Sequence, residues 1–144
     1  ETVDAPIGRH RTKRTRMAVT DNGRPATTHY RVLARFASHS FIAVRLETGR
    51  THQIRVHLAW RHHPLVGDPV YGGRLKIPQG ASTTLVDTLK SFRRQALHAS
   101  DLGFEHPLTG ESMAFHASLP EDLLGLLNVL GGGSAMDYEA MLWP

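Results

Sequence analysis

The stretch that decides the fold is GRTHQIRVHLAWRHHPLVGDPVYGG, residues 49–73, in which arginines and histidines interrupt an apolar series with helical spacing. Thr51 is a suitable N-cap, because its hydroxyl can accept a hydrogen bond from a free backbone amide of the first helical turn. Pro64 and Gly67 stop helical structure. The stretch therefore predicts a helix over 51–61 that is followed by a loop.

Apolar side chains surround most of the circumference of that helix. These side chains are Ile54, Val56, Leu58, Ala59 and Trp60. A helix that is apolar nearly all round is expected to be buried. On a helical wheel Arg55 shares a side with Thr51 and His52. A second polar side carries Arg50, His57 and Arg61.

Arg55 needs an acidic partner, because a buried guanidinium is costly unless a carboxylate and further hydrogen bonds satisfy it. Two acids are candidates. Glu47 stands at the end of the preceding strand, and Asp68 stands in a tight Gly/Pro loop. Either could form a structural ion pair with Arg55, which is the more frequent role of such pairs. The Gly-Asp-Pro setting of Asp68 is also typical of a side chain that stabilises a turn.

On the N-terminal side of the helix, two runs have the alternation of β-strands. THYRVLARF (residues 28–36) and SFIAVRLET (residues 40–48) flank a short polar break and predict an antiparallel hairpin. In the first run, one face is expected to carry Tyr30, Val32, Ala34 and Phe36. Leu33 is then expected on the opposite face, between two arginines.

On the C-terminal side, the sequence predicts a surface helix over 81–92, a second hairpin and a last helix. The apolar stripe of the surface helix consists of Leu85, Leu89 and Phe92. The hairpin joins 95–106 to 112–119 through PLTGE. The last helix begins near Pro120 and carries acids in its first turn. From the residues alone, the fold class is α+β with a buried helix.

The composition limits the classes of protein that fit. The chain has 144 residues, enough for one domain with a sizeable core, and no cysteine, which excludes disulfides, a thiolate nucleophile and a Cys-based zinc site. Neither a signal peptide nor an apolar run long enough to cross a bilayer is visible, so the expected compartment is the cytoplasm. The first residue is Glu1 rather than Met, which indicates a processed product or a cloned piece of a longer protein.

A basic segment near the N-terminus is the main charge feature. RHRTKRTR, residues 9–16, carries five lysines and arginines without an acid, in a chain whose formal net charge is +4. We call this segment the basic arm. Such a run favours a polyanion through steering and counterion release. A solvated basic strand or arm without a ligand is an equally frequent interpretation.

The motifs of several common enzyme classes are missing from the sequence. His52 and His57 are five residues apart and cannot share one helix face, while His62 and His63 are adjacent and diverge, so a metal site is disfavoured. Neither a G-x-S-x-G elbow nor a Walker A or G-x-G-x-x-G pattern occurs. The residues alone thus predict a basic α+β domain with a buried arginine, and they do not identify a reaction.

A family resemblance adds what spacing does not give. ETGRTHQIRVHLAWRHHPLVGDPVYGG resembles the hallmark stretch of the RluA-type pseudouridine synthases, and the likeness extends from IGRHRTKRTRMAV through ATTHYRVL to RQALHASDLGFEHPLTGESMAFHASLP. It covers about residues 5–125. The resemblance implies a mixed, mostly antiparallel sheet and an enzyme that isomerises uridine in RNA to pseudouridine without a cofactor. In that reaction the glycosidic bond is cut, the uracil is turned, and C5 is joined to the ribose.

The family also implies roles for particular residues. An aspartate is its essential catalytic group, a basic residue pairs with it, and an aromatic residue stacks on the flipped uracil. The match at QIRVH implies that Arg55 is the basic partner, and the match at ALHA implies that Leu97 packs near the target base. The residues expected to bind RNA are Arg9, Arg11, Lys13, Arg14, Arg16, Arg50 and His52. The implied partner is large-subunit ribosomal RNA or its precursor, with no metal, no membrane and no required protein partner.

The sequence departs from the family pattern in two motifs. It contains no H-R-L-D-x-x-T-S-G string, which carries the catalytic aspartate, and no K-x-Y-x-A string, which carries the stacking tyrosine; Tyr30 and Tyr71 belong to other motifs. We therefore expect residues 1–130 to be the C-terminal portion of a catalytic domain that is inactive alone. Residues 131–144 are expected to be a flexible or docking tail, or partly derived from cloning. The alternatives are a non-catalytic RNA-binding module and, more distantly, a histidine-rich metal-dependent nuclease.

Overall fold

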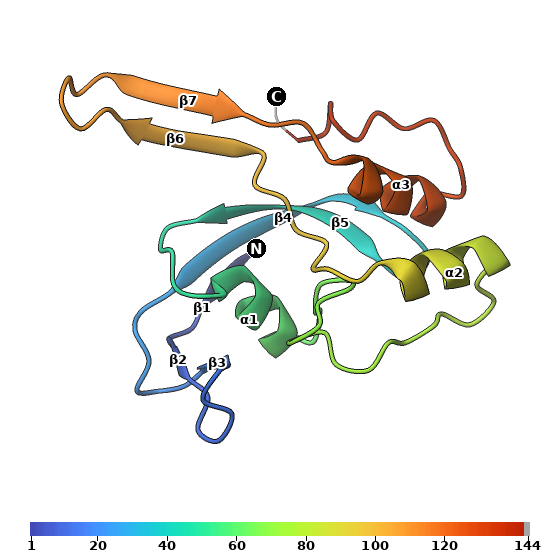
Figure 1. Cartoon of the computed structure of the whole chain (residues 1–144), viewed down its shortest axis with the longest axis horizontal. Helices are drawn as coiled ribbons and strands as arrows, with labels where there is room; N and C mark the ends of the chain where they lie inside the picture. Colours follow the sequence, from blue (N-terminus) through green and yellow to red (C-terminus); the bar gives the residue numbers. More distant parts are fainter. Residues whose placement is uncertain (143–144) are drawn as a thin grey trace.

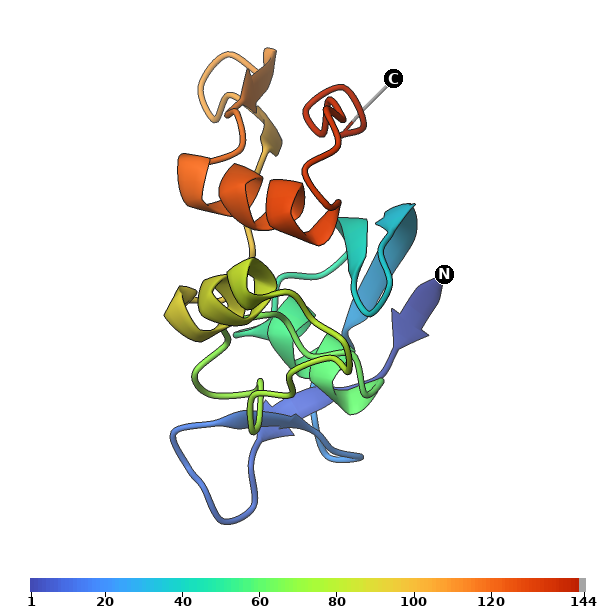
Figure 2. The ribbon, with the colours of Figure 1, turned by 90° about the vertical axis from the view of Figure 1, so that its right-hand side faces the viewer.

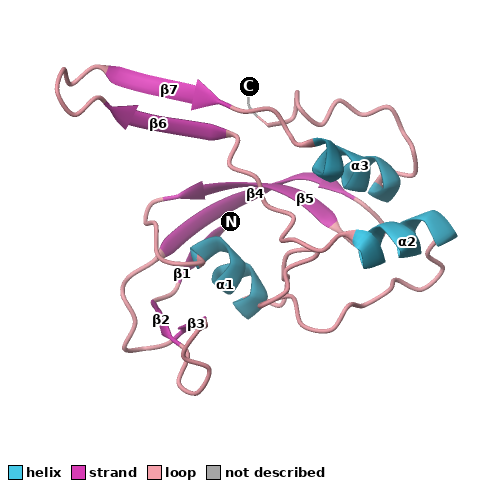
Figure 3. Cartoon of the chain, viewed as in Figure 1, coloured by secondary structure: helices cyan, strands magenta, loops and turns pink. Residues whose placement is uncertain are grey.

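The structure is a computed structural model that describes residues 1–142 (Figures 1 and 3). Its largest sheet has the strand order β1-β4-β5, with β1 at Thr2–Asp4, β4 at Thr27–Arg35 and β5 at Ser40–Leu46. A two-stranded ladder joins β2 (Ile7–Arg9) to β3 (Met17–Val19). Every strand pair is antiparallel. Among the described residues, no helix is long and apolar enough to span a membrane.

The predicted hairpin before the helix is confirmed as β4 and β5, but the predicted alternation along β4 is wrong. A β-bulge between Val32 and Ala34 shifts the register. Leu33 and Phe36, expected on opposite faces, both pack against the same core cluster. The physical reason is that a bulge inserts one unpaired residue, which reverses the facing of the residues that follow it.

Helix α1 spans Gln53–Trp60, and its N-cap is His52 rather than the predicted Thr51. His52 has φ 56° and ψ 23°, a left-handed conformation, and its side chain does not cap the helix. The side chain of Gln53 organises this turn instead, because its Oε1 accepts from the Arg50 amide at 2.9 Å and from the Thr48 hydroxyl at 2.8 Å. The Gln53 side chain thus holds the segment that leads into α1, and no side chain caps the helix itself.

The predicted burial of α1 is confirmed for most of the helix, because Gln53, Arg55, Val56, His57 and Leu58 are buried, whereas Trp60 is 50% exposed. The helical wheel grouped His57 with Arg50 and Arg61 on one polar side, but His57 is buried while Arg61 is exposed. His57 is fully buried, with Nε2 2.8 Å from the Ala5 carbonyl oxygen and Nδ1 2.8 Å from the Thr28 hydroxyl. Acceptors and hydroxyls on neighbouring segments thus allow α1 to bury polar side chains against the sheet.

The predicted elements after the loop are confirmed. Helix α2 spans Thr83–Ser91, and Leu85, Leu89 and the C-cap residue Phe92 belong to one core cluster. Helix α3 spans Glu121–Leu130, with Pro120 at its N-cap and acids in its first turn. The two helices lie side by side (Figures 1 and 2). Strands β6 (Asp101–Glu105) and β7 (Ser112–His116) form the second hairpin, at the outside of the molecule in Figure 1.

The C-terminal segment returns to the core around α3. Tyr138 is 1% exposed and donates a hydrogen bond from its hydroxyl to the Leu127 carbonyl at 3.1 Å. Leu142 is also buried, in the same core cluster as Tyr138 and the α3 residues Leu123, Leu126 and Leu127. Residues 143–144 of the predicted tail lie outside the described part of the chain.

Candidate functional site

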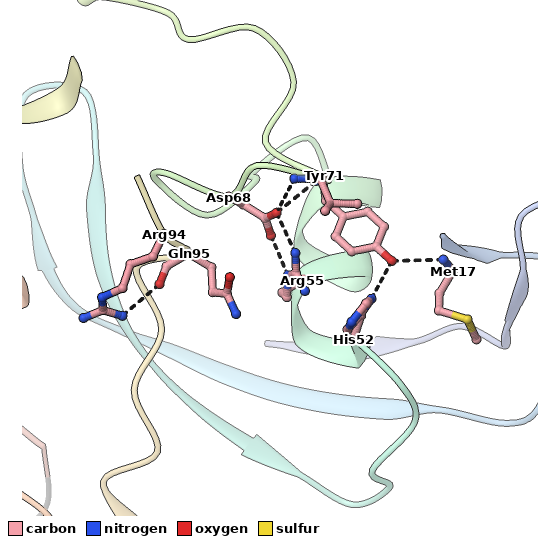
Figure 4. Close-up of polar contacts among 8 residues, drawn as sticks. Met17, His52, Arg55, Asp68, Tyr71, Arg94 and Gln95 are labelled. Atoms are coloured by element: carbon pink, nitrogen blue, oxygen red, sulfur yellow. Dashed lines mark hydrogen bonds and ion pairs between the residues drawn. The ribbon is translucent and has the colours of Figure 1, made fainter. Parts of the chain in front are cut away.

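The site is built on a two-point ion pair between Arg55 and Asp68 (Figure 4). The Arg55 Nε donates to Asp68 Oδ2 at 2.8 Å, and its Nη2 donates to Asp68 Oδ1 at 2.9 Å. The side chains are 10% and 0% exposed respectively. Glu47, the other candidate partner, instead lies 2.5 Å from His29 Nε2. The residue types left two acids open, and the structure assigns Asp68.

Asp68 also stabilises its own turn, as its Gly-Asp-Pro setting predicted. Its Oδ1 accepts from the amides of Val70 and Tyr71 at 2.9 and 3.0 Å. Burial by itself would raise the pKa of this carboxyl, but the hydrogen bonds from Arg55, Tyr71 and Val70 outweigh it and lower the pKa to about 2. Asp68 is therefore a permanent anion at neutral pH.

Arg55 stays protonated because the neighbouring Asp68 carboxylate stabilises its positive charge. The hydrogen bond to Asp68 raises the pKa of Arg55 above its ordinary value, although burial opposes this. Among the described residues, the hydrogen bonds of Arg55 use Nε and Nη2. A guanidinium has five N–H donors, so the donors on Nη1 remain for a further acceptor.

Tyr71 lies against Arg55 and contacts two other segments. The Arg55 Cζ is 4.9 Å from the centre of the Tyr71 ring, within the range of a cation–π contact. The Tyr71 hydroxyl accepts from the Met17 amide at 2.9 Å and lies 2.8 Å from His52 Nδ1. Figure 4 shows Tyr71 between Arg55 on one side and Met17 and His52 on the other.

The basic arm consists of Arg9, the last residue of β2, and the loop that joins β2 to β3. Its residues Arg9, Arg11, Lys13 and Arg14 are exposed, and Arg16 is half-buried. The loop is closed by its own groups, because Arg9 Nη1 donates to the Arg14 carbonyl at 3.0 Å and His10 Nδ1 accepts from the Lys13 amide at 3.1 Å. Met17, the first residue of β3, directly follows the arm and is bonded to Tyr71. The arm therefore ends at the Arg55 site.

His52, Arg50 and Leu97 were also expected at the site. His52 is exposed apart from its contact with Tyr71, and Arg50 is half-buried with its Nε donating to the Pro25 carbonyl at 2.9 Å. Leu97 is half-buried and lines a large open hollow of about 2180 Å³, which Asp68 and Tyr71 also line. Within residues 1–142, no group of three or more metal-ligating side chains could hold an ion.

Charge is divided sharply along the chain. All 17 lysines and arginines and six of the 13 acids lie in residues 1–94, which gives that part a formal charge of +11. Residues 95–144 carry the other seven acids and no lysine or arginine, hence −7. The basic arm and α1 lie in the basic part of the sequence, and the hairpin β6–β7 lies in the acidic part.

Sequence reasoning did not assign Tyr71 to the site. Its contact with Met17 spans 54 residues along the chain, and no local pattern predicts such a contact. A signal was present in the spacing of GDPVYGG, because an Asx-type turn at Asp68 brings the amide three residues later onto the carboxylate. That turn fixes Tyr71 beside any partner of Asp68.

A family model and the curated relatives of this sequence all point to pseudouridine synthases. Residues 1–60 match the family described as RNA pseudouridylate synthase. The chain is 59% identical over 128 residues to ribosomal large subunit pseudouridine synthase D of Vibrio parahaemolyticus, which covers 89% of the chain and 39% of that protein. The same-named protein of Pseudomonas aeruginosa is 60% identical over 129 residues, 90% of the chain and 40% of that protein. The chain thus spans about two fifths of the length of the curated relatives it matches.

Solved structures agree with the fold. The structure is similar to human RNA pseudouridylate synthase domain containing 4, with a TM-score of 0.65 and 27% identity over 91% of this chain and 56% of that one. Human RNA pseudouridylate synthase domain containing 1 gives a TM-score of 0.64 at 27% identity over 83% of this chain and 48% of that one. These likenesses confirm the predicted α+β fold with mostly antiparallel strands.

Proposed function

We infer that this chain, which belongs to the RNA pseudouridylate synthase family, is a portion of an enzyme that isomerises uridines to pseudouridine in large-subunit ribosomal RNA. The observation that carries this is the 57–60% identity, over about nine tenths of the chain, to proteins named for that activity. Residues 1–130 are proposed to be the C-terminal portion of the catalytic domain and 131–144 a flexible or docking tail, and the burial of Tyr138 and Leu142 favours docking. A ribosomal RNA substrate implies action in the cytoplasm.

In this proposal Arg55 is the cationic partner of the catalytic aspartate, which lies outside the chain. Asp68 occupies the Nε and Nη2 side of the guanidinium, so the second carboxylate is held from Nη1. A nearby guanidinium lowers the pKa of a carboxyl and keeps it ionised, which the aspartate requires whether it acts as a nucleophile at the sugar or as a base. Asp68 fixes the plane of Arg55 so that this contact is directional.

RNA binding is proposed for the basic arm together with Arg50 and His52. Support comes from the exposure of Arg11, Lys13 and Arg14, and from the formal charge of +11 on residues 1–94. Phosphate contacts of this kind position RNA but do not read its sequence. Leu97 supplies an apolar contact near the flipped base, in keeping with its place on the hollow that Asp68 also lines.

The chain alone is proposed to be catalytically silent, because its sequence lacks the H-R-L-D-type string. The test is tritium release from RNA labelled at C5 of uridine, with the 144-residue chain and the full-length native protein assayed side by side. We expect release by the full-length protein only. Turnover by the chain alone, after its mass has been verified, would overthrow this part of the proposal.

A non-catalytic RNA-binding module is the alternative, and the arm is the observation that favours it. Arg11, Lys13 and Arg14 would serve recognition equally well without catalysis. The two proposals differ in the native sequence that precedes Glu1. An H-R-L-D-type motif there supports the synthase, and a full-length protein that binds RNA without releasing tritium supports the module.

A further inference from the structure

Tyr71 joins three parts of the molecule that are distant in the sequence. Its ring lies against Arg55, its hydroxyl contacts Met17 and His52, and its amide donates to Asp68. We propose that Tyr71 is a positioning residue that holds the end of the basic arm and the guanidinium of Arg55 in one rigid unit, so that RNA bound at the arm orients Arg55. This inference rests on the proposed function.

The first step is the attachment of the arm. Met17 pairs with Arg9 in the β2–β3 ladder, and the amide of His10 donates to the Arg16 carbonyl at 2.9 Å, so the arm closes where β3 begins. The Met17 amide points out of that ladder to the Tyr71 hydroxyl at 2.9 Å. A shift of the closed arm on binding RNA is therefore transmitted to the hydroxyl of Tyr71.

The second step, the link from the arm to α1, depends on the hydroxyl of Tyr71 and not only on its ring. The Tyr71 oxygen accepts from the Met17 amide at 2.9 Å and also lies 2.8 Å from His52 Nδ1, so one hydroxyl joins the two residues. His52 stands in a left-handed conformation, at φ 56°, which costs energy for a residue other than glycine. Its side chain turns to Tyr71 instead of capping α1. The hydroxyl thus ties the arm to the N-cap residue of the helix that carries Arg55.

The third step is the control of Arg55 itself. The guanidinium is confined by the Tyr71 ring at 4.9 Å and by the carboxylate of Asp68, whose Oδ1 also accepts from the Tyr71 amide. Tyr71 therefore acts on Arg55 directly through the ring and indirectly through Asp68. A phenylalanine would keep the ring and the amide but lose both contacts of the hydroxyl.

The test follows the Arg55 side-chain Nε–H signal of this chain by NMR while a short uridine-containing stem-loop RNA is added. Tyr71→Phe is the informative variant. Tyr138→Phe, which likewise removes a tyrosine hydroxyl but one that is bonded to the Leu127 carbonyl beside α3, is the matched control. In the wild-type chain and the control, RNA should shift the Arg55 signal. In Tyr71→Phe, RNA should bind within about twofold of the wild-type affinity, because phosphate contacts carry it, yet most of the shift should disappear.

A full RNA-induced shift of Arg55 in a folded Tyr71→Phe chain would overturn the inference. The wild-type chain supplies a second check: the Met17 amide and Arg55 signals should change together along the titration, and different midpoints would also overturn it. If the wild-type chain binds no RNA, the proposed role of the arm fails, and this inference fails with it. In the full-length enzyme Tyr71→Phe should lower kcat and leave KM nearly unchanged; an unchanged kcat there counts against Tyr71 even if RNA binds.

Discussion

Arg55 and Asp68, thirteen residues apart, face each other across a buried contact in which two N–H donors meet two carboxylate oxygens at 2.8 and 2.9 Å. The same carboxylate holds the turn that follows it through the amides of Val70 and Tyr71. One acidic side chain therefore fixes both the orientation of the arginine and the loop that brings the tyrosine to it. Stability and the geometry of the site are linked through Asp68.

Replacing Asp68 should destabilise the chain strongly. Asp68→Ala leaves the Arg55 guanidinium without its partner and frees two backbone amides, and removal of one member of a buried pair typically costs about 3–5 kcal/mol. Urea unfolding measures the change. Asp122→Ala is the control, because it breaks a two-point pair with Arg94 that is largely exposed, and its effect should be much smaller. Similar losses in the two variants would contradict the importance of the buried pair.

Asp68 should also make the stability of the chain depend on pH in the acid range. Its pKa is about 2 in the folded state and 3.8 as the ordinary value, so its stabilisation is present above pH 3.8 and is lost as the pH falls through about 2. This difference in pKa corresponds to about 2 kcal/mol. Unfolding free energies of wild type and Asp68→Asn, measured at several pH values, give the contribution by difference. If the difference between the two stays constant from pH 5 to pH 2, the assigned pairing is contradicted.

Binding of RNA to the chain should be mainly electrostatic. Neutralising Arg11, Lys13 and Arg14 to Gln should reduce the slope of log K against log salt by about 1 for each phosphate contact that is lost. Fluorescence anisotropy over a range of salt concentrations measures the slope. Lys90→Gln, an exposed change on α2 away from the arm, should leave the slope unaltered. Binding that does not depend on salt would refute the assignment of the arm.

Sequence reasoning succeeded where the determinants were local. The alternation in 28–36 and 40–48 predicted the β4–β5 hairpin, and the stripe of Leu85 and Leu89 predicted α2. It failed at the start of α1, where the N-cap is His52 in a left-handed conformation rather than Thr51, a backbone choice that the local residue types do not reveal. The bulge after Val32 could not be predicted either, since it depends on the pairing of two strands.

The site could be predicted only in part, because its partners are brought together by the loop after α1. The cost of burying a lone guanidinium required an acid for Arg55, and the residue types reduced the choice to Glu47 or Asp68. Choosing between them required the path of the loop. The role of Tyr71 depends on Met17, which is far away in sequence, so it could be found only from the structure.

The measurement that tests the central claim most directly is the single-turnover rate of the full-length protein carrying Arg55→Ala, with its melting temperature recorded on the same sample. The account predicts that turnover collapses while RNA binding falls much less, because the phosphate contacts lie elsewhere. Arg55→Lys should recover turnover only in part, since an ammonium restores the charge without the two-point geometry. Arg50→Ala, whose lost contact is to the Pro25 carbonyl, should affect mainly binding or folding. A folded Arg55→Ala enzyme with near-normal turnover would contradict the catalytic role of Arg55 and leave its pair with Asp68 as a purely structural contact.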